Sequence, residues 1–220
     1  MIEFIHFFVM SQCQIVSCDI LLEFLEIAFN GILFYRNLYP KEIFGRKKIY
    51  GIAVNISQHP EVNQYIKNIL ETIRELIIYD EKCVKNINLV FYDSKKLIVE
   101  KYVFHLFDFK FDAKELDPYF LKTEEALRTL CLKLSMTNAY LNPLSEDCTF
   151  TIEIDTHEAA HIAISENPKC EDFPWITKSE STDELNIMRN NLLPLTTINT
   201  EYLGLQMYVI THDNESNNDI

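Results

Sequence analysis

Apolar residues between Ser17 and Leu38 recur every three or four positions, which is the spacing of one buried helix face. The positions on this face are Leu22, Leu25, Phe29, Ile32 and Leu33, with Glu23, Glu26 and Asn30 between them. The pattern predicts a long amphipathic helix that ends at Tyr39-Pro40. The basic run Arg46-Lys47-Lys48 then predicts a solvated turn rather than a phosphate site, and a short apolar strand follows it.

A second helix is predicted from Pro60 to about Tyr79, because proline is favourable in the first helical turn. Its apolar stripe consists of Ile66, Ile69, Leu70, Ile73, Leu76 and Ile77. Two β-like segments follow at 87–92 and 97–107. The turn at 93–96 joins them as a hairpin, although it lacks the glycine that such turns favour.

A third helix is expected to begin near Pro118, with an apolar stripe made of Leu121, Leu127, Leu130, Cys131 and Leu134. Residues 149–154 alternate between apolar and polar types, which predicts another strand. Up to this point the pattern is that of three helices packed on an antiparallel sheet, an α+β fold. Beyond Pro168 prolines and polar residues dominate until a strand-like run at 202–210, and the tail after Thr211 is expected to be disordered.

Chain length, net charge and glycine content exclude several classes of function. The chain has 220 residues, 48% of them hydrophobic, which is enough for one substantial core. Its formal charge of −13 disfavours direct binding of nucleic acid, which requires a basic surface. Only four glycines are present, and no glycine-rich phosphate loop of the Rossmann or P-loop kind occurs.

The six cysteines allow two interpretations. An even number is compatible with disulfides, but the chain is long and has no C-x-x-C pair. Its start, MIEFIHFFVM, lacks the positive charge of a signal peptide, and the apolar run Phe4–Met10 is too short to cross a membrane. We therefore expect free, buried thiols in a reducing compartment, and no membrane partner.

The sharpest catalytic motif is His157-Glu158-Ala159-Ala160-His161, an H-E-x-x-H sequence. On a helix its histidines bind Zn²⁺ and its glutamate acts as a base, with Glu180 or Glu184 as a third ligand, so a zinc peptidase is an alternative. The motif directly follows a predicted strand, on a short helix that Pro168 ends. A metal site needs buried, supported ligands, so we predict solvated histidines, no bound metal and no catalytic residues.

Several segments resemble the HORMA-domain family. The first is DILLEFLEIAFNGILFYRNLYPKEIFGRKKIYGIAVNISQHPEVNQYI, residues 19–65, and later ones are DFPWI from Asp172, LLPL from Leu192 and LQMYV from Leu205. The resemblance runs from about Gln12 to Ile210. HPEVNQYI, DFPWI and LQMYV favour the branch that contains the small non-catalytic subunit of translesion DNA polymerase zeta. The spindle-checkpoint branch, an alternative, shares the pattern at 32–40.

The resemblance implies a HORMA fold in which a C-terminal "safety belt" encloses a partner peptide paired with the sheet edge. It implies a variable extension at 1–11, a HORMA domain at 12–211 and a tail at 212–220. Within the domain, 12–167 is the expected core and 168–211 the expected belt. The implied protein is an adaptor without cofactor that acts in translesion synthesis and DNA repair, in the nucleus and also in the cytoplasm.

The resemblance also assigns residues to partners. Tyr65 and Trp175 match positions that contact a peptide of the polymerase zeta catalytic subunit, although both also suit a plain core. The positions that bind the C-terminal domain of a Y-family scaffold polymerase are matched by Leu192, Gln206 and Tyr208. Arg128 and Ala139 match the helix-three surface used in HORMA homodimers or heterodimers, although Arg128 also suits a simple surface charge. An AAA+ remodelling ATPase is a further expected partner.

Overall fold

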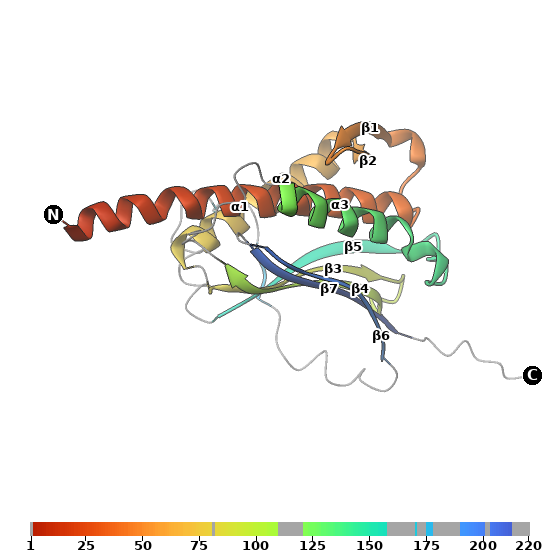
Figure 1. Ribbon diagram of the computed structural model, residues 1–220. Coiled ribbons are helices and arrows are strands. Elements are labelled where there is room, and N and C mark those ends of the chain that lie inside the picture. Colours follow the sequence, from red (N-terminus) through yellow and green to blue (C-terminus); the bar gives the residue numbers. More distant parts are fainter. Residues whose placement is uncertain are drawn as a thin grey trace, which may run out of the picture.

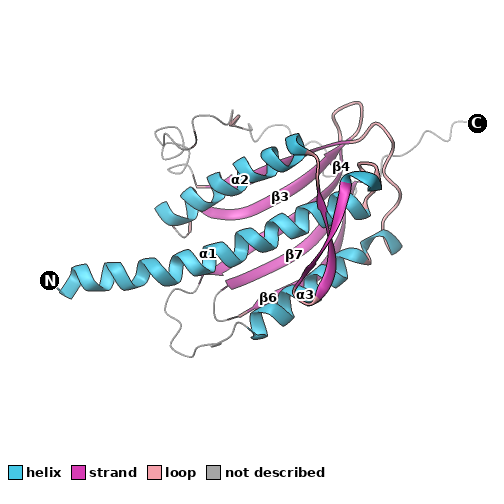
Figure 2. Cartoon of the chain, turned by 90° about the horizontal axis from the view of Figure 1, so that it is seen from above, coloured by secondary structure: helices cyan, strands magenta, loops and turns pink. Residues whose placement is uncertain are grey.

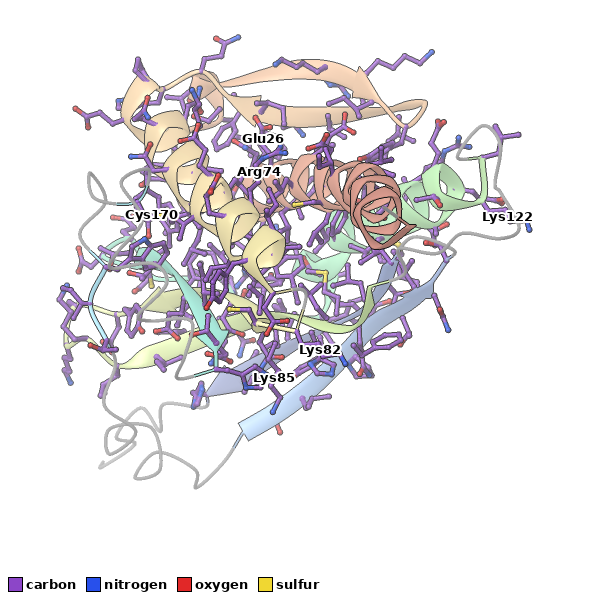
Figure 3. The ribbon with its side chains drawn as sticks, turned by 90° about the vertical axis from the view of Figure 1, so that its left-hand side faces the viewer. Glu26, Arg74, Lys82, Lys85, Lys122 and Cys170 are labelled. Carbon is purple, nitrogen blue, oxygen red and sulfur yellow. The ribbon has the colours of Figure 1, made fainter. Side chains whose placement is uncertain are left out.

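The structure is a computed structural model. It describes residues 2–80, 82–109, 121–157, 170, 175–177, 190–200 and 203–212, and of residues 2–14, 108, 109 and 190 it describes only the backbone. In this part of the chain, three helices lie on one face of a five-stranded antiparallel sheet, and a two-stranded hairpin lies on the other side of the helices (Figures 1 and 3). The predicted α+β fold, with three helices packed on an antiparallel sheet, is confirmed.

The helices are α1 (Ile2–Tyr35), α2 (Pro60–Tyr79) and α3 (Leu121–Ser135), with short 3-10 turns at Lys41–Ile43 and Thr137–Ala139. The sheet contains β3 (Val84–Tyr92), β4 (Ile98–Phe109), β5 (Thr149–Thr156), β6 (Asn190–Asn199) and β7 (Leu203–His212), in the order β5-β3-β4-β7-β6. The hairpin consists of β1 (Phe44–Ile49) and β2 (Ile52–Ser57). Viewed from above, α1 lies between α2 and α3, and its N-terminal end projects beyond the sheet (Figure 2).

Helix α1 differs from the amphipathic helix that was predicted. It begins at Ile2 and ends at Tyr35, before the expected end at Tyr39-Pro40. Its central part is buried almost all round, because α2, α3, β2 and the sheet surround it. Asn30, one of the polar residues between the apolar positions, is buried. Its amide oxygen accepts a 2.8 Å hydrogen bond from the Ser57 backbone N–H, and its amide nitrogen donates to the Glu26 carbonyl.

The basic run also differs from its prediction. Arg46, Lys47 and Lys48 are not a turn, because they form the middle of β1 and pair with Asn55, Val54 and Ala53 of β2. Their side chains are exposed, as expected of a solvated run. The turn itself is Tyr50-Gly51, where both residues have positive φ.

The middle of the chain follows the predictions. Helix α2 has the predicted bounds and buries the predicted stripe. Strands β3 and β4 form the predicted hairpin, and Lys96 takes the left-handed conformation (φ 65°) that glycine would favour. The side chain of Asp93 supports this turn by accepting hydrogen bonds from the backbone N–H groups of Lys95 and Leu97.

Two C-terminal features were predicted less well. Leu121 was assigned to the buried stripe of α3 but is 64% exposed, while Leu127, Leu130, Cys131 and Leu134 are buried. The predicted start at Pro118 lies outside the described residues. The strand-like run at 202–210 is β7, whereas β6 was missed because Pro194 interrupts its strand pattern.

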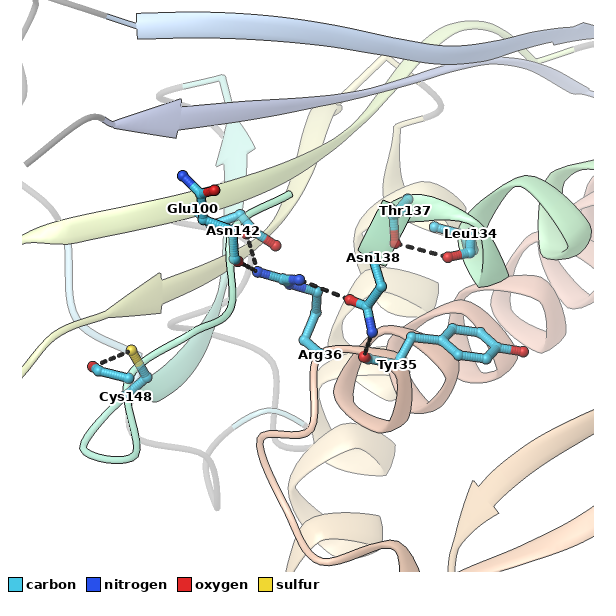
Figure 4. A network of polar contacts seen from close by, with 9 residues as sticks. Tyr35, Arg36, Glu100, Leu134, Thr137, Asn138, Asn142 and Cys148 are labelled. Carbon is cyan, nitrogen blue, oxygen red and sulfur yellow. Dashed lines mark hydrogen bonds and ion pairs between the residues drawn. The ribbon is translucent and has the colours of Figure 1, made fainter. Parts of the chain in front are cut away.

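A buried polar network joins the end of α1 to the sheet (Figure 4). The guanidinium of Arg36 donates to a Glu100 carboxylate oxygen at 2.9 Å, to the Asn138 side chain at 2.7 Å and to the Asn142 carbonyl at 2.5 Å. Burial raises the pKa of Glu100 more than Arg36 lowers it. The network therefore fixes how α1, α3 and β4 sit together at a cost in desolvation.

Candidate functional site

Among the described strands, the two outer ones are β5 and β6, and there β5 pairs only with β3. An outer strand presents backbone N–H and C=O groups to whatever lies beside it. One of these groups on β5, the Ile152 N–H, donates a 3.1 Å hydrogen bond to the hydroxyl of Tyr65 on α2. The Tyr65 hydroxyl therefore occupies the side of β5 on which another strand would pair.

Aromatic rings surround this position. The ring of Phe150 on β5 packs edge-to-face against Tyr65, with centroids 5.5 Å apart, and against Tyr39, with centroids 6.2 Å apart. Burial raises the pKa of Tyr65, so its hydroxyl keeps its proton at neutral pH. Aromatic rings thus line the edge of β5, and the uncharged hydroxyl of Tyr65 lies against its backbone.

Trp175 lies further along the same face of α2. Its indole N–H donates a 3.3 Å hydrogen bond to the hydroxyl of Thr72, which is seven residues, or about two helical turns, after Tyr65. The Trp175 ring is half-buried and packs against the main core. Cys170 is buried and lies beside α2, on the β5 side of the molecule (Figure 3).

Tyr65 and Trp175, which the sequence assigned to one partner, therefore lie on the same face of α2, and Tyr65 joins this face to the edge of β5. The described parts of the connection between β5 and β6 are His157, Cys170 and residues 175–177. This connection starts at one edge of the sheet and ends at the other, because β5 and β6 are the two outer strands. The division into a core at 12–167 and a belt at 168–211 stays a prediction, and residues 190–212 contribute β6 and β7 to the sheet.

Leu192, Gln206 and Tyr208 form a second group, at the β6 edge. Register pairs Leu192 with Ile210, Pro194 with Tyr208 and Thr197 with Gln206, so the three side chains stand on the sheet face away from the helices. Leu192 is 61% exposed, Gln206 is exposed and Tyr208 is half-buried. The structure thus brings the three residues together and separates them from Tyr65 and Trp175 by the width of the sheet.

Arg128 and Ala139, which the sequence assigned to one surface of the third helix, lie in different elements of the structure. The Arg128 side chain is partly exposed on α3, but its Nε donates a 2.7 Å hydrogen bond to the Tyr50 carbonyl in the β1–β2 turn. Arg128 therefore holds this turn against α3 in addition to being a surface charge. Ala139 is exposed, but it lies in the 3-10 turn after α3 rather than on the helix itself.

The zinc-peptidase alternative gains no support from the described residues. His157 follows β5 directly, and its backbone N–H donates to the Cys83 carbonyl. Glu158, Ala159, Ala160, His161, Glu180 and Glu184 lie outside the described residues. Among the residues that are described, no group of three His, Cys, Asp or Glu side chains is placed to hold a metal.

The described cysteines behave as buried apolar residues. Cys18, Cys83, Cys131, Cys148 and Cys170 all have free, buried thiols. Burial raises the pKa of Cys18 to about 11 and that of Cys131 to about 12, so both remain thiols at neutral pH. No helix in the described part of the chain is long and apolar enough to cross a membrane.

Sequence reasoning missed Phe150 and Thr72 as parts of the site. The alternation at 149–154 predicted which way Phe150 faces, but it does not reveal that β5 is an outer strand. Thr72 was missed because its role depends on Trp175, which lies 103 residues away in sequence. No local signal in the sequence indicates such a contact.

Comparison with known proteins places these features in a family. The family model described as HORMA domain matches residues 17–202. The human protein named mitotic spindle assembly checkpoint protein MAD2B is 35% identical over 194 residues, covering 88% of this chain and 90% of the relative. The Drosophila melanogaster protein named DNA polymerase zeta subunit 2 is 26% identical over 196 residues, covering 89% of this chain and 96% of the relative.

Solved structures agree on the fold. A chain in the crystal structure of the mitotic checkpoint complex superposes with a TM-score of 0.71 at 23% identity, covering 90% of this chain and 99% of that one. Caenorhabditis elegans HTP-2, solved bound to HTP-3 closure motif 1, superposes with a TM-score of 0.63 at 14% identity. That match covers 90% of this chain and 87% of HTP-2.

Proposed function

The chain belongs to the HORMA-domain family, and from this membership we propose that it is the non-catalytic accessory subunit of DNA polymerase zeta. In this role it holds an extended, proline-containing peptide of the catalytic subunit against the outer edge of β5. The names of its relatives in the fruit fly and in Arabidopsis thaliana, both given as subunits of DNA polymerase zeta, support the assignment.

One observation carries the proposal: the outer edge of β5 has an aromatic wall, and Tyr65 bonds its backbone. A peptide that pairs with such an edge gains main-chain hydrogen bonds, and side-chain pockets give it specificity. Each of these bonds contributes only about 0.5–1.5 kcal/mol net. A long-lived complex therefore needs enclosure as well, for which Trp175, anchored on α2 beside this edge, is well placed.

Enclosure by the connection between β5 and β6 would make binding and release slow. A peptide held between β5 and this connection leaves only when the connection opens locally, and the free energy of that opening sets the lifetime. The closure-motif complex of HTP-2 shows that a protein of this fold binds a partner's motif. This supports peptide capture here without identifying the peptide.

A second surface would bridge the polymerase to another protein. Leu192 on β6 is four strand spacings, or roughly 19 Å, from β5, and its neighbours Gln206 and Tyr208 on β7 are three spacings, or roughly 14 Å, from it. At this separation a folded domain at β6 does not exclude a peptide at β5. We assign the second surface to the C-terminal domain of a Y-family scaffold polymerase, which makes the protein an adaptor in translesion synthesis and DNA repair.

The remaining assignments follow from the same role. The protein is not an enzyme and needs no cofactor, because its task is to hold two partners. Arg128 and Ala139 would contribute to pairing with a second HORMA domain, and an AAA+ ATPase would open the closed form. The protein would act in the nucleus and also occur in the cytoplasm.

A second candidate function is supported by the printed name of the human relative, a mitotic spindle assembly checkpoint protein. A checkpoint adaptor would use the same β5 edge for a peptide from a different partner. The two functions therefore differ in the partner and not in the site.

Affinity purification of the tagged protein with mass spectrometry distinguishes these functions. Recovery of a large B-family polymerase, lost in a Trp175→Ala variant and retained in an Ile176→Ala variant, is the expected result. Ile176 is the matched control because it is adjacent and 89% exposed. Recovery of checkpoint proteins without any polymerase would replace the proposal with the second candidate.

A further inference from the structure

The hydrogen bond between Ile152 and Tyr65 joins a backbone N–H of β5 to a side-chain hydroxyl of α2, at 3.1 Å. On its other side β5 is paired with β3, where Ile152 is in register with Leu89. Within a sheet, the acceptor for such an N–H is a backbone carbonyl of the next strand. The Tyr65 hydroxyl therefore stands where the carbonyl of an added strand would stand.

The packing of the protein itself holds the hydroxyl in this position. The Tyr65 ring packs edge-to-face on Phe150, with centroids 5.5 Å apart, and Phe150 precedes Ile152 by two residues on the same face of β5. Burial raises the pKa of Tyr65, so the hydroxyl is an uncharged acceptor at neutral pH. The bond thus forms in the free protein without any ligand.

We infer that the Tyr65 hydroxyl is an autoinhibitory group: it occupies the Ile152 N–H in the free protein and must leave before a peptide pairs along the whole β5 edge. Neighbouring strands lie about 4.8 Å apart, with their hydrogen bonds between them. The hydroxyl and a peptide carbonyl therefore cannot both take the acceptor position at Ile152. The inference rests on the proposed peptide capture and adds an internal competitor to it.

An internal competitor has a thermodynamic consequence that a simple contact residue does not have. The bond stabilises only the free protein, so a peptide that pairs at Ile152 loses it on binding. Removal of the hydroxyl should therefore destabilise the free protein and strengthen peptide binding. A hydroxyl that bonds the peptide would give the opposite change in affinity, because its removal would weaken the complex.

Tyr65→Phe separates these two roles, because it keeps the ring on Phe150 and removes the hydroxyl. Fluorescence anisotropy with a fluorescein-labelled peptide of the polymerase catalytic subunit, incubated to equilibrium, measures the dissociation constant. We expect this constant to fall about two- to tenfold, the factor that corresponds to the net free energy of one hydrogen bond. The melting temperature of the free variant should fall at the same time.

Tyr79→Phe is the matched control. It makes the same substitution in the same helix, at the last residue of α2, where the side chain is 66% exposed. Its dissociation constant and melting temperature should equal those of the unaltered protein. If Tyr65→Phe binds the peptide no better than the unaltered protein, the inference is wrong and peptide capture stands. If neither protein binds the peptide, the proposed function is wrong and the inference falls with it.

Amide hydrogen exchange of Ile152, followed by NMR spectroscopy on isotope-labelled protein, tests the contact in the free proteins. We expect this N–H to exchange about two- to tenfold faster in Tyr65→Phe than in the unaltered protein or in Tyr79→Phe. Saturating peptide should slow the exchange to one common level, because a peptide carbonyl then replaces the hydroxyl. Equal exchange in all the free proteins would mean that another group protects the N–H, which would overturn the inference.

Discussion

The two outer strands of the sheet differ in how far their outer backbone N–H and C=O groups are blocked from pairing with another strand. At β6, Pro194 removes a backbone donor, a register shift between Pro194 and Thr196 interrupts the ladder, and Lys133 of α3 donates to the Leu195 carbonyl. These are the usual ways in which an outer strand avoids pairing with another chain. At β5 the ladder with β3 is regular from Asn86 to Tyr92, and the Tyr65 hydroxyl accepts from Ile152.

The comparison teaches that the two edges suit different kinds of recognition. An edge with a regular ladder and no proline suits an extended peptide, which pairs with the backbone itself and displaces the Tyr65 hydroxyl from the Ile152 N–H. A protected edge leaves side chains as the means of contact, and Leu192, Gln206 and Tyr208 stand beside the protected edge. One sheet thus accommodates a peptide site and a side-chain surface without overlap.

Trp175→Ala should have the largest effect on this comparison. Its ring packs on α2 beside the β5 edge, so we expect peptide affinity to fall by at least about 2 kcal/mol, the scale of a hot-spot residue. Binding of the scaffold polymerase domain at the β6 edge should stay within error. Calorimetric titration with both partners measures the two effects.

The control for Trp175 is Ile176→Ala, which removes an exposed side chain of the same segment. The fold should persist in both variants, because the three helices and strands β3 to β5 are formed without residue 175. Normal peptide binding by Trp175→Ala, or loss of its cooperative unfolding transition, would show that the tryptophan is part of the core alone.

Tyr208→Ala tests the opposite edge. The half-buried ring stands beside Leu192 on the outer face, so its loss should weaken binding of the scaffold polymerase domain by more than about 1 kcal/mol. Peptide affinity should not change, and Leu192→Ala should act in the same direction. Surface plasmon resonance with each partner measures the two dissociation constants. A Tyr208→Ala variant that loses peptide binding and keeps binding of the scaffold polymerase domain would reverse the assignment of the edges.

Tyr65→Phe sharpens the description of the β5 edge. It keeps the ring that packs on Phe150 and removes the hydroxyl that accepts from the Ile152 N–H. We expect the free energy of unfolding to fall by about 1 kcal/mol, the net contribution of one hydrogen bond. Urea denaturation measures it, and Tyr39→Phe, in the same aromatic cluster, is the control that should change little. Equal stability of the two variants would mean that β5 does not depend on the hydroxyl.

Much of the fold could be predicted from the sequence, because its signals are local. Helix α2 begins at a proline and carries a continuous apolar stripe, and β3 and β4 alternate around a short polar turn. The errors arose where tertiary contacts override local patterns. Asn30 looked solvated but bonds Ser57 from β2, and Arg46 to Lys48 looked like a turn but pair with β2.

The candidate site was accessible to sequence reasoning only in part. The family resemblance singled out Tyr65 and Trp175, and the structure places both on one face of α2. The Ile152 backbone and Phe150 escaped notice, because their importance depends on strand order. A strand pattern indicates which residues share a face but not which strand is outermost, and a polar residue in a strand does not reveal whether it has a partner.

The smallest expected change in stability comes from removing the protection of β6. A Pro194→Thr, Lys133→Ala double variant restores a backbone donor at the edge and frees the Leu195 carbonyl that Lys133 now bonds. Both positions are at the edge of the sheet, so the free energy of unfolding should change by less than about 0.5 kcal/mol. The freed edge should nevertheless pair with a second copy, because outer strands with unprotected backbone groups associate.

Sedimentation velocity at increasing protein concentration detects this pairing. The double variant should form dimers at concentrations where the unaltered protein does not change, and Lys133→Ala alone should have a smaller effect, since proline still blocks the edge. Adding the polymerase peptide should not dissolve the new dimers, because the peptide belongs to β5. If the peptide does dissolve them, the two copies associate through β5, and Pro194 and Lys133 are not what protects β6.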